Sequence, residues 1–176
     1  MSDTNGFRLY AVRAPRIDEA DELAELHVQI WRETYADDMR AEFLEALDPA
    51  PRAEMWRRVA AEEAEGVAGA DGRTVRVAVD PESGRVAGFG MVGPGRDDDP
   101  PQPTELRALN IARDHHGRGA AGQLLAATLG DRPAYLWVVE GNARAQAFYR
   151  KHGFELDGGR TVDDESGAVE LRMTRA

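Results

Sequence analysis

The segment His116-Gly117-Arg118-Gly119-Ala120-Ala121-Gly122 combines glycines, an arginine and the first turn of an alanine-rich helix. Glycine lets backbone N–H groups approach a ligand without obstruction from a Cβ atom. The first amides of a helix lack intrahelical partners, and the helix dipole adds positive potential there. These features predict a site for phosphate or pyrophosphate, although a glycine-rich turn is more often only a turn. The segment matches neither the P-loop nor the dinucleotide-binding pattern.

A second segment with chemical potential begins at Asn142 and ends at Phe154. Asn142 follows a predicted strand, where it can cap the next helix or orient a ligand. Tyr149 lies about two helical turns further, so the two side chains project toward the same side. A phenol in that place can donate a proton to a leaving group. The alternative is a tyrosine that covers the core and keeps its hydroxyl in solvent.

These two segments resemble motifs of the GNAT acetyltransferases. The family's cofactor loop follows the pattern Gln/Arg-x-x-Gly-x-Gly/Ala, to which residues 116–121 are similar. Its signature Asn-x-x-Ala-x-x-x-Tyr-x-x-x-Gly-Phe is met by Asn142, Ala145, Tyr149, Gly153 and Phe154. The resemblance is specific over residues 105–154, because both motifs occur in order and each follows a predicted strand.

His116 departs from this pattern, since the family prefers glutamine or arginine in its place. Histidine still donates a hydrogen bond, and Arg118 can compensate through a charge-assisted contact with phosphate. The strength and the pH dependence of pyrophosphate binding are therefore open at this position.

The resemblance implies an α/β (α+β) fold in a single domain over residues 1–176. The expected sheet is mixed and mostly antiparallel, with about seven strands flanked by helices. Its fourth and fifth strands, residues 105–111 and 134–139, are expected to be parallel and splayed apart. Acetyl-CoA is the implied cosubstrate in the gap between them, with no metal ion. The implied cofactor-binding residues are Leu109, Asn110, Ile111, His116, Gly117, Arg118, Gly119, Ala120, Ala121, Gly122, Asn142 and Tyr149.

The reaction implied by the resemblance is direct attack of a primary amine on the thioester carbonyl. Ile111 N–H is then the expected oxyanion donor, and Tyr149 the expected general acid. Glu105 matches a position that serves as general base in some family members; the alternatives are an ordinary acidic residue at a strand entrance and deprotonation through water. Two other functions stay open: a noncatalytic acyl-CoA-binding or regulatory module, and an unrelated phosphate-binding protein.

The acceptor is expected to meet the first half of the chain. His27, Trp31 and Tyr35 recur every four residues and share one helical face, so they are candidates for an acceptor pocket. An aromatic stripe of this spacing is more often part of the core. Residues 97–99 are three consecutive aspartates, which either attract a basic acceptor or form a solvated loop. Glu140 is a further candidate for a carboxylate in the acceptor pocket.

The amino-acid composition limits the classes of ligand and partner that the protein is expected to bind. The 176 residues include 32 acidic and 22 basic ones, for a formal net charge of −10. This charge disfavours nucleic acid and favours a cationic small molecule or peptide, although acidity also maintains solubility. The sequence has no cysteine, which excludes disulfides and thiolate metal sites. Short apolar runs and the absence of a visible signal peptide predict no membrane contact and a cytoplasmic location. A homodimer stays open, since dimers are the commonest assemblies.

Periodicity and turn residues predict the elements that must position these side chains. A helix is expected to begin with Asp18 as its N-cap. The other expected helices span residues 40–47, 51–65, 119–129 and 142–152. The expected strands span residues 7–12, 74–79, 85–92, 105–111, 134–139, 154–156 and 168–173.

Overall fold

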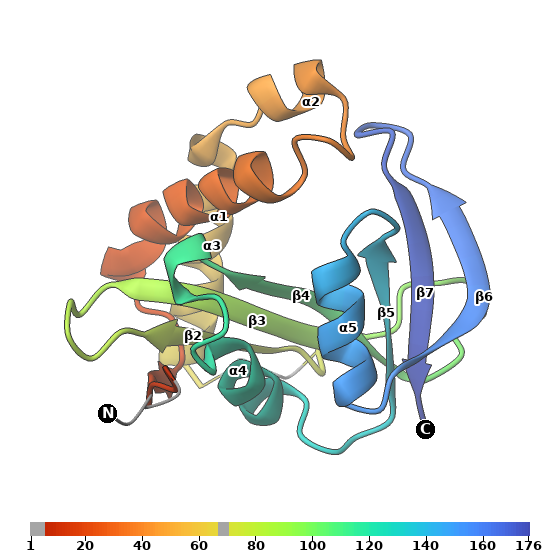
Figure 1. Cartoon of the computed structure of the whole chain (residues 1–176). Helices are drawn as coiled ribbons and strands as arrows, with labels where there is room; N and C mark the ends of the chain where they lie inside the picture. The colour runs from red at the N-terminus through yellow and green to blue at the C-terminus, as the bar shows by residue number, and fades with distance from the viewer. Residues whose placement is uncertain (1–5, 67–70) are drawn as a thin grey trace, which may run out of the picture.

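A seven-stranded sheet forms the centre of the computed structural model, which describes residues 6–66 and 71–176 (Figure 1). The strands are β1 (Ala11–Arg13), β2 (Thr74–Val79), β3 (Val86–Pro94), β4 (Thr104–Ile111), β5 (Ala134–Val139), β6 (Glu155–Val162) and β7 (Val169–Arg175). The helices are α1 (Ala20–Thr34), α2 (Ala41–Glu45), α3 (Pro49–Ala64), α4 (Ala120–Thr128) and α5 (Ala143–Lys151). Short 3₁₀ helices span Ile17–Glu19 and Arg113–His115.

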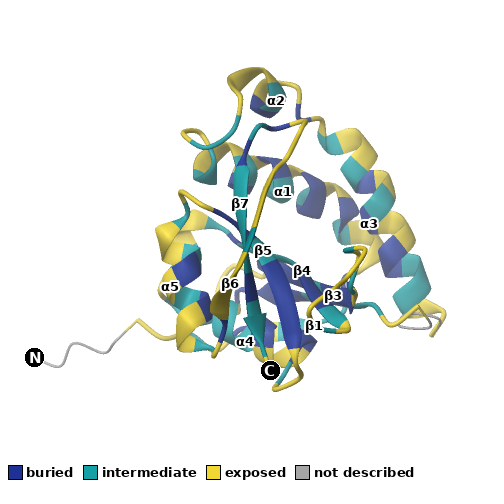
Figure 2. Ribbon diagram, turned by 90° about the vertical axis from the view of Figure 1, so that its right-hand side faces the viewer, coloured by how far each residue is buried: buried dark blue, intermediate teal, exposed yellow. Residues whose placement is uncertain are grey.

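The strand order is β1-β2-β3-β4-β5-β7-β6, and only β4 and β5 run parallel. Helices α1 and α3 cover one face of the sheet, while α4 and α5 cover the other (Figures 1 and 2). This arrangement confirms the predicted mixed sheet with one parallel, splayed pair. No helix in the described ranges is long and apolar enough to cross a membrane.

Alternation along the strands explains how the sheet holds helices on both faces. Val75 and Val77 of β2 pack in the cluster under α1 and α3, whereas Ala78 packs in the cluster under α4. Successive side chains of a strand point to opposite faces, so one strand serves both cores. Trp56 of α3 is fully buried and meets Phe89 of β3 edge-on, with ring centroids 4.9 Å apart. This pair holds α3 on the sheet.

A β-bulge changes the course of β4. Met91 pairs with Ala108 and Val92 pairs with Leu106, which leaves Arg107 as an extra residue in β4. A bulge bends its strand and increases the local twist. Before the bulge β4 therefore runs beside β5, and after the bulge it diverges from β5.

A single register pair, Glu105 with Tyr135, joins β4 to β5. Arg96 binds Glu105 through two side-chain hydrogen bonds, from Nε at 2.8 Å and from Nη2 at 2.6 Å. The backbone N–H of Arg96 also donates to the Tyr135 hydroxyl at 2.9 Å. The point at which the two strands part is thus held by side chains from β4, from β5 and from the loop before β4.

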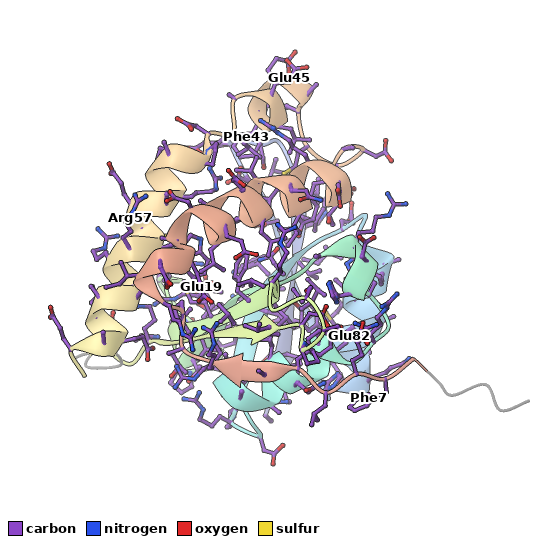
Figure 3. The ribbon with its side chains drawn as sticks, turned by 90° about the vertical axis from the view of Figure 1, so that its left-hand side faces the viewer. Phe7, Glu19, Phe43, Glu45, Arg57 and Glu82 are labelled. Carbon is purple, nitrogen blue, oxygen red and sulfur yellow. The ribbon has the colours of Figure 1, made fainter. Side chains whose placement is uncertain are left out.

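The segment before β1 differs from its prediction. The strand expected over residues 7–12 begins only at Ala11. Before it, the Gln123 side chain of α4 accepts from Tyr10 N–H at 2.9 Å and donates to the Arg8 carbonyl at 2.7 Å. The chain therefore lies along α4 as an arm, and Figure 3 shows Phe7 near its outer end. The Gln123 side chain thus forms the hydrogen bonds that a neighbouring strand would otherwise form with this part of the backbone.

Two helix starts also test the sequence reasoning. The expected N-cap at Asp18 is wrong, because Asp18 lies inside a 3₁₀ turn and Glu19 precedes α1. Glu19 pairs with Arg13 instead of capping the helix. Asp48, by contrast, caps α3 by accepting from Ala50 N–H at 2.9 Å. At the other end of the chain, β6 is longer than expected and forms an exposed edge (Figure 2).

Gly88 of β3 provides a test of how closely β3 and β4 must approach. A Cβ atom there would lie 2.5 Å from the Asn110 carbonyl oxygen and 3.1 Å from the Ile111 Cα. Gly88→Ala is expected to lower the free energy of unfolding by about 1–3 kcal/mol, the usual cost of overpacking. Gly90→Ala is the matched control, because its nearest neighbour would be a Thr128 methyl group at 3.3 Å. Urea denaturation followed by circular dichroism measures both; equal stabilities would contradict the prediction.

Candidate active site

A cleft of about 1030 Å³ opens where β4 and β5 diverge. Its walls come from β4 and β5, from the first turns of α4 and from α5, and its far side is closed by α1. The parallel β4–α4–β5 crossover brings these elements together, because both strands point their carboxyl ends at the same edge of the sheet. The candidate motifs therefore meet in one place.

Beyond the pair Glu105–Tyr135, the edge of β4 that faces the gap has no neighbouring strand. Ala112 N–H donates to the Ala87 carbonyl at 2.8 Å, which sets the side of β4 that faces β3. Backbone groups alternate along a strand, so those of Asn110 also face β3. The backbone groups of Leu109 and Ile111 face the gap instead. Of the three residues predicted to pair with an extended ligand, two are thus oriented for it and Asn110 is not.

The loop between β4 and α4 depends on two glycines. Gly117 and Gly119 have φ angles of 73° and 95°, which residues with a Cβ atom rarely adopt. In the part of the chain that the structure describes, the amides of residues 119–122 donate to no other protein group. A Cβ atom at Gly122 would meet only His152 Nε2, at 3.9 Å. At Gly122 the helix start therefore faces open space, as an anion site requires, whereas the Phe7 ring lies against Gly119.

His116 ties this loop to the end of β4. Its Nε2 lies 2.9 Å from the Ile111 carbonyl oxygen and donates to it, since a carbonyl can only accept. The other ring nitrogen faces the Arg144 guanidinium of α5. Burial lowers the pKa of His116, and the bond to Ile111 offsets this in part. His116 therefore acts as a neutral brace of the loop, which sequence reasoning did not foresee.

Tyr149 and Asn142 share one side of α5, as their spacing predicts. Asn142 caps α5 by accepting from Ala145 N–H at 3.1 Å. Tyr149 lines the cleft and is only 8% exposed, and burial raises the pKa of its phenol. Tyr35, which follows the last residue of α1, raises that pKa further. The alternative of a hydroxyl in open solvent does not describe Tyr149.

The aromatic stripe of α1 lines the cleft and also packs. The ring centroids of His27 and Trp31 are 5.5 Å apart, and those of Trp31 and Tyr35 are 5.9 Å apart. His27 also lies against Phe89, at 5.0 Å. All three stripe residues contribute to the cleft wall. The stripe therefore packs and also lines the cleft, and its role in binding the acceptor stays a prediction.

Glu105 lies beside the cleft rather than in its wall. It is 3% exposed, does not line the cleft, and gives both carboxylate oxygens to Arg96. A base must have a free oxygen within reach of the proton that it takes. This geometry favours a structural role for Glu105 at the fork.

The other acidic candidates lie outside the wall as well. Asp97 accepts from Trp137 Nε1 and from Arg172, each at 3.1 Å, so it supports the loop. Glu140 is exposed and pairs with Arg160. Among the residues that the structure describes, no three His, Asp or Glu side chains are grouped as metal ligands would be.

One carboxylate that lines the cleft was missed by the sequence reasoning. Glu170 of β7 stands opposite Val139 of β5 and is half-buried in the wall. Burial raises the pKa of Glu170, and Asp163 raises it further. A polar residue that alternates with apolar ones in a strand usually faces solvent, so the sequence carried no signal for this position.

Comparison with known proteins agrees with this geometry. The model of the family described as "Acetyltransferase (GNAT) family" matches residues 20–154. The uncharacterized N-acetyltransferase YuaI of Bacillus subtilis is 27% identical over 171 residues, which is 94% of this chain and 89% of that protein. The uncharacterized N-acetyltransferase Rv2669 of Mycobacterium tuberculosis is 39% identical over 84 residues. That match covers 44% of this chain and about half, 51%, of the relative.

Among solved structures, the PaiA N-acetyltransferase of Thermoplasma acidophilum in complex with coenzyme A has a TM-score of 0.71. It is 18% identical, and the match covers 96% of this chain and 99% of that one. A likeness at this identity concerns the fold.

His27 allows a test of the packing on the acceptor side. Burial lowers its pKa from 6.5 to about 4. The unfolded chain therefore takes up a proton near its ordinary pKa of about 6.5, while the folded protein does so only near its lowered value. Stability attributable to neutral His27 is present above that window and is lost as the pH falls through it, by about 2–3 kcal/mol.

His27→Gln is expected to remove this part of the pH dependence. Urea denaturation of both proteins at pH 7.5 and near pH 4 measures it, because the other titrating groups are common to both. If the difference in unfolding free energy between the two proteins did not change with pH, His27 would not be buried in neutral form.

Proposed function

Because this chain belongs to the GNAT acetyltransferase family, we propose that it moves the acetyl group of acetyl-CoA to a primary amine of a small molecule or peptide. The observation that carries the proposal is the fork between β4 and β5. A free strand edge, a loop of unpartnered amides and a buried tyrosine face one cleft there. These are the features that an extended thioester with an anionic end requires.

The chain offers suitable groups along the whole length of acetyl-CoA. Leu109 can form strand-like hydrogen bonds with the amides of the pantetheine arm, whereas the Ile111 carbonyl is already held by His116. The amides of residues 119–122 can hold the pyrophosphate, with the Arg118 side chain beside them. His116 would support the loop from behind rather than bind phosphate itself.

Two groups of the chain would then act on the reaction. Acetyl-CoA supplies the thioester whose acetyl group passes to the amine. Ile111 N–H, which faces the gap, stabilises the carbonyl oxygen as it gains negative charge. The Tyr149 phenol gives its proton to the departing sulfur and regains one from the acceptor nitrogen. Its raised pKa keeps Tyr149 protonated at neutral pH, as a general acid must be.

In this proposal Glu105 shapes the fork and does not take the amine proton. Its carboxylate would first have to leave Arg96, and breaking a buried ion pair is costly. The proton acceptor is then another group in the cleft.

Two measurements test the proposal directly. Calorimetry with CoA measures binding, and thiol release from acetyl-CoA across a panel of primary amines measures transfer. Both are expected to succeed. CoA binding without turnover on any amine would support a noncatalytic acyl-CoA-binding module, and failure to bind CoA would contradict both functions.

Gly122 allows a test of the anion site without disturbing the core. Its missing side chain faces open space in the cleft, so Gly122→Val would place two methyl groups among the free amides. CoA affinity is expected to fall by at least about tenfold, which corresponds to 1.4 kcal/mol. Ala127→Val is the matched control, because Ala127 is exposed on the same helix and does not line the cleft. Equal affinities in calorimetry would refute this placement of the phosphates.

Tyr149→Phe tests the general acid. Loss of the phenol proton is expected to lower kcat by roughly 100-fold, the lower end for general acid catalysis, while the Kd for CoA stays unchanged. Tyr10→Phe is the control, since Tyr10 is equally buried but does not line the cleft. Steady-state thiol release measures both variants. A Tyr149→Phe enzyme with wild-type kcat would exclude this role.

A further inference from the structure

The half of the cleft that faces α1 is apolar and aromatic. Its wall includes Trp31, Tyr35, Met39 and Trp137. Trp137 and Val139 share one face of β5, because the alternate residue Val138 packs in the cluster under α5. The pairing of Val139 with Glu170 places Glu170 on this same face. One carboxylate therefore lies within an aromatic wall.

Glu170 is unlike the other acidic residues. Of the described residues that line the cleft, it is the only acidic one, in a chain with 32 acidic residues. Within residues 6–66 and 71–176 its carboxylate takes part in no ion pair or hydrogen bond, whereas the buried Asp80 pairs with Arg8 and Glu105 pairs with Arg96. A half-buried carboxylate without a partner costs free energy, so its presence indicates a cation that the chain itself does not supply.

Two arginines near Glu170, Arg96 and Arg172, are already paired with other carboxylates. Arg96 is bound to Glu105. Arg172 is bound to Asp97 at 3.1 Å and to Asp157 at 2.8 Å. Neither arginine is therefore available to neutralise Glu170.

We propose that Glu170 binds the ammonium group of the acceptor and takes its proton, and that the acceptor is a small monoamine on an aromatic or aliphatic body. This inference rests on the acetyl transfer proposed above and adds the acceptor class. Trp31, Tyr35 and Trp137 would cover the apolar body, and aromatic faces also attract a cation. One carboxylate matches one ammonium group, because each further ammonium of a polyamine or aminoglycoside would be desolvated without a partner.

The proton passes from the ammonium N–H to an oxygen of Glu170 and then to water, and the amine keeps its free electron pair. Burial raises the pKa of Glu170, which makes its carboxylate a better proton acceptor. Asp163 and Glu105 raise this pKa as well, and Arg96 lowers it. Tyr35, which follows the last residue of α1, is a further titratable group that interacts with Glu170.

Glu170→Gln removes the charge and keeps the shape of the side chain. Glu140→Gln is the matched control, because Glu140 is exposed at the end of β5, pairs with Arg160 and does not line the cleft. Thiol release measures kcat/KM for 2-phenylethylamine and for spermidine. Calorimetry measures the Kd of each amine for the CoA-bound protein, and the Kd of CoA reports whether each variant is folded.

The wild-type protein is expected to prefer 2-phenylethylamine to spermidine. Glu170→Gln is expected to lower kcat/KM for 2-phenylethylamine by about 100-fold, with unchanged CoA affinity, and Glu140→Gln to match the wild type. The Kd for the amine should rise about tenfold in Glu170→Gln. In the wild type kcat/KM rises with pH as Glu170 loses its proton, and this limb is expected to vanish in Glu170→Gln.

A second variant keeps the inference testable if Glu170→Gln does not fold. Trp137→Leu is expected to raise KM for 2-phenylethylamine by about tenfold and to leave KM for methylamine unchanged. Preference for spermidine, unchanged kcat/KM in Glu170→Gln, or an unchanged KM in Trp137→Leu overturns the inference and leaves acetyl transfer standing. CoA binding with neither amine binding nor turnover overturns the inference together with the proposed function.

Discussion

Where two parallel strands separate, backbone N–H and C=O groups lose their hydrogen-bond partners in the sheet. Such groups must then form hydrogen bonds with side chains, water or a ligand. In this protein β4 and β5 share one register pair, and the extra residue Arg107 turns the rest of β4 away. Arg96, Glu105 and Tyr135 hold the point of separation. The free edge, the loop before α4 and the side chains of α5 are all positioned relative to this fork. A ligand with amide groups along its length is what the open edge can accept.

Charge is distributed differently on the surface and in the cleft. The chain carries a formal net charge of −10, yet the described part of the cleft wall contains one carboxylate and several basic side chains. Arg144 of α5 meets His116 of the loop before α4, and Glu170 interacts with Tyr35 at the end of α1. Surface charges are screened over about 8 Å at physiological salt. The acidic surface therefore influences how cations approach the protein, whereas the residues that line the cleft determine which ligand binds.

Local signals in the sequence were sufficient for much of the fold and for the motifs. The alternating valines of β2 predict a strand from neighbouring residues alone, and the structure has this strand over the expected residues. Contacts set by strand register were not predictable in this way. Glu170 reaches the cleft because β7 pairs with β5, and Arg96 reaches Glu105 from a loop without periodicity. The strand expected from Phe7 starts late because the Gln123 side chain binds the preceding backbone.

The two halves of the cleft are built from different lengths of chain. The half with the free amides is formed by two nearly continuous stretches, residues 106–123 and 142–152. The half that faces α1 combines single side chains from α1, α3, β3, β5 and β7. Substitutions at separated sites usually have additive effects. In evolutionary terms, the scattered wall can change one residue at a time, and descendants of this chain can acquire new acceptors while they inherit the other half intact.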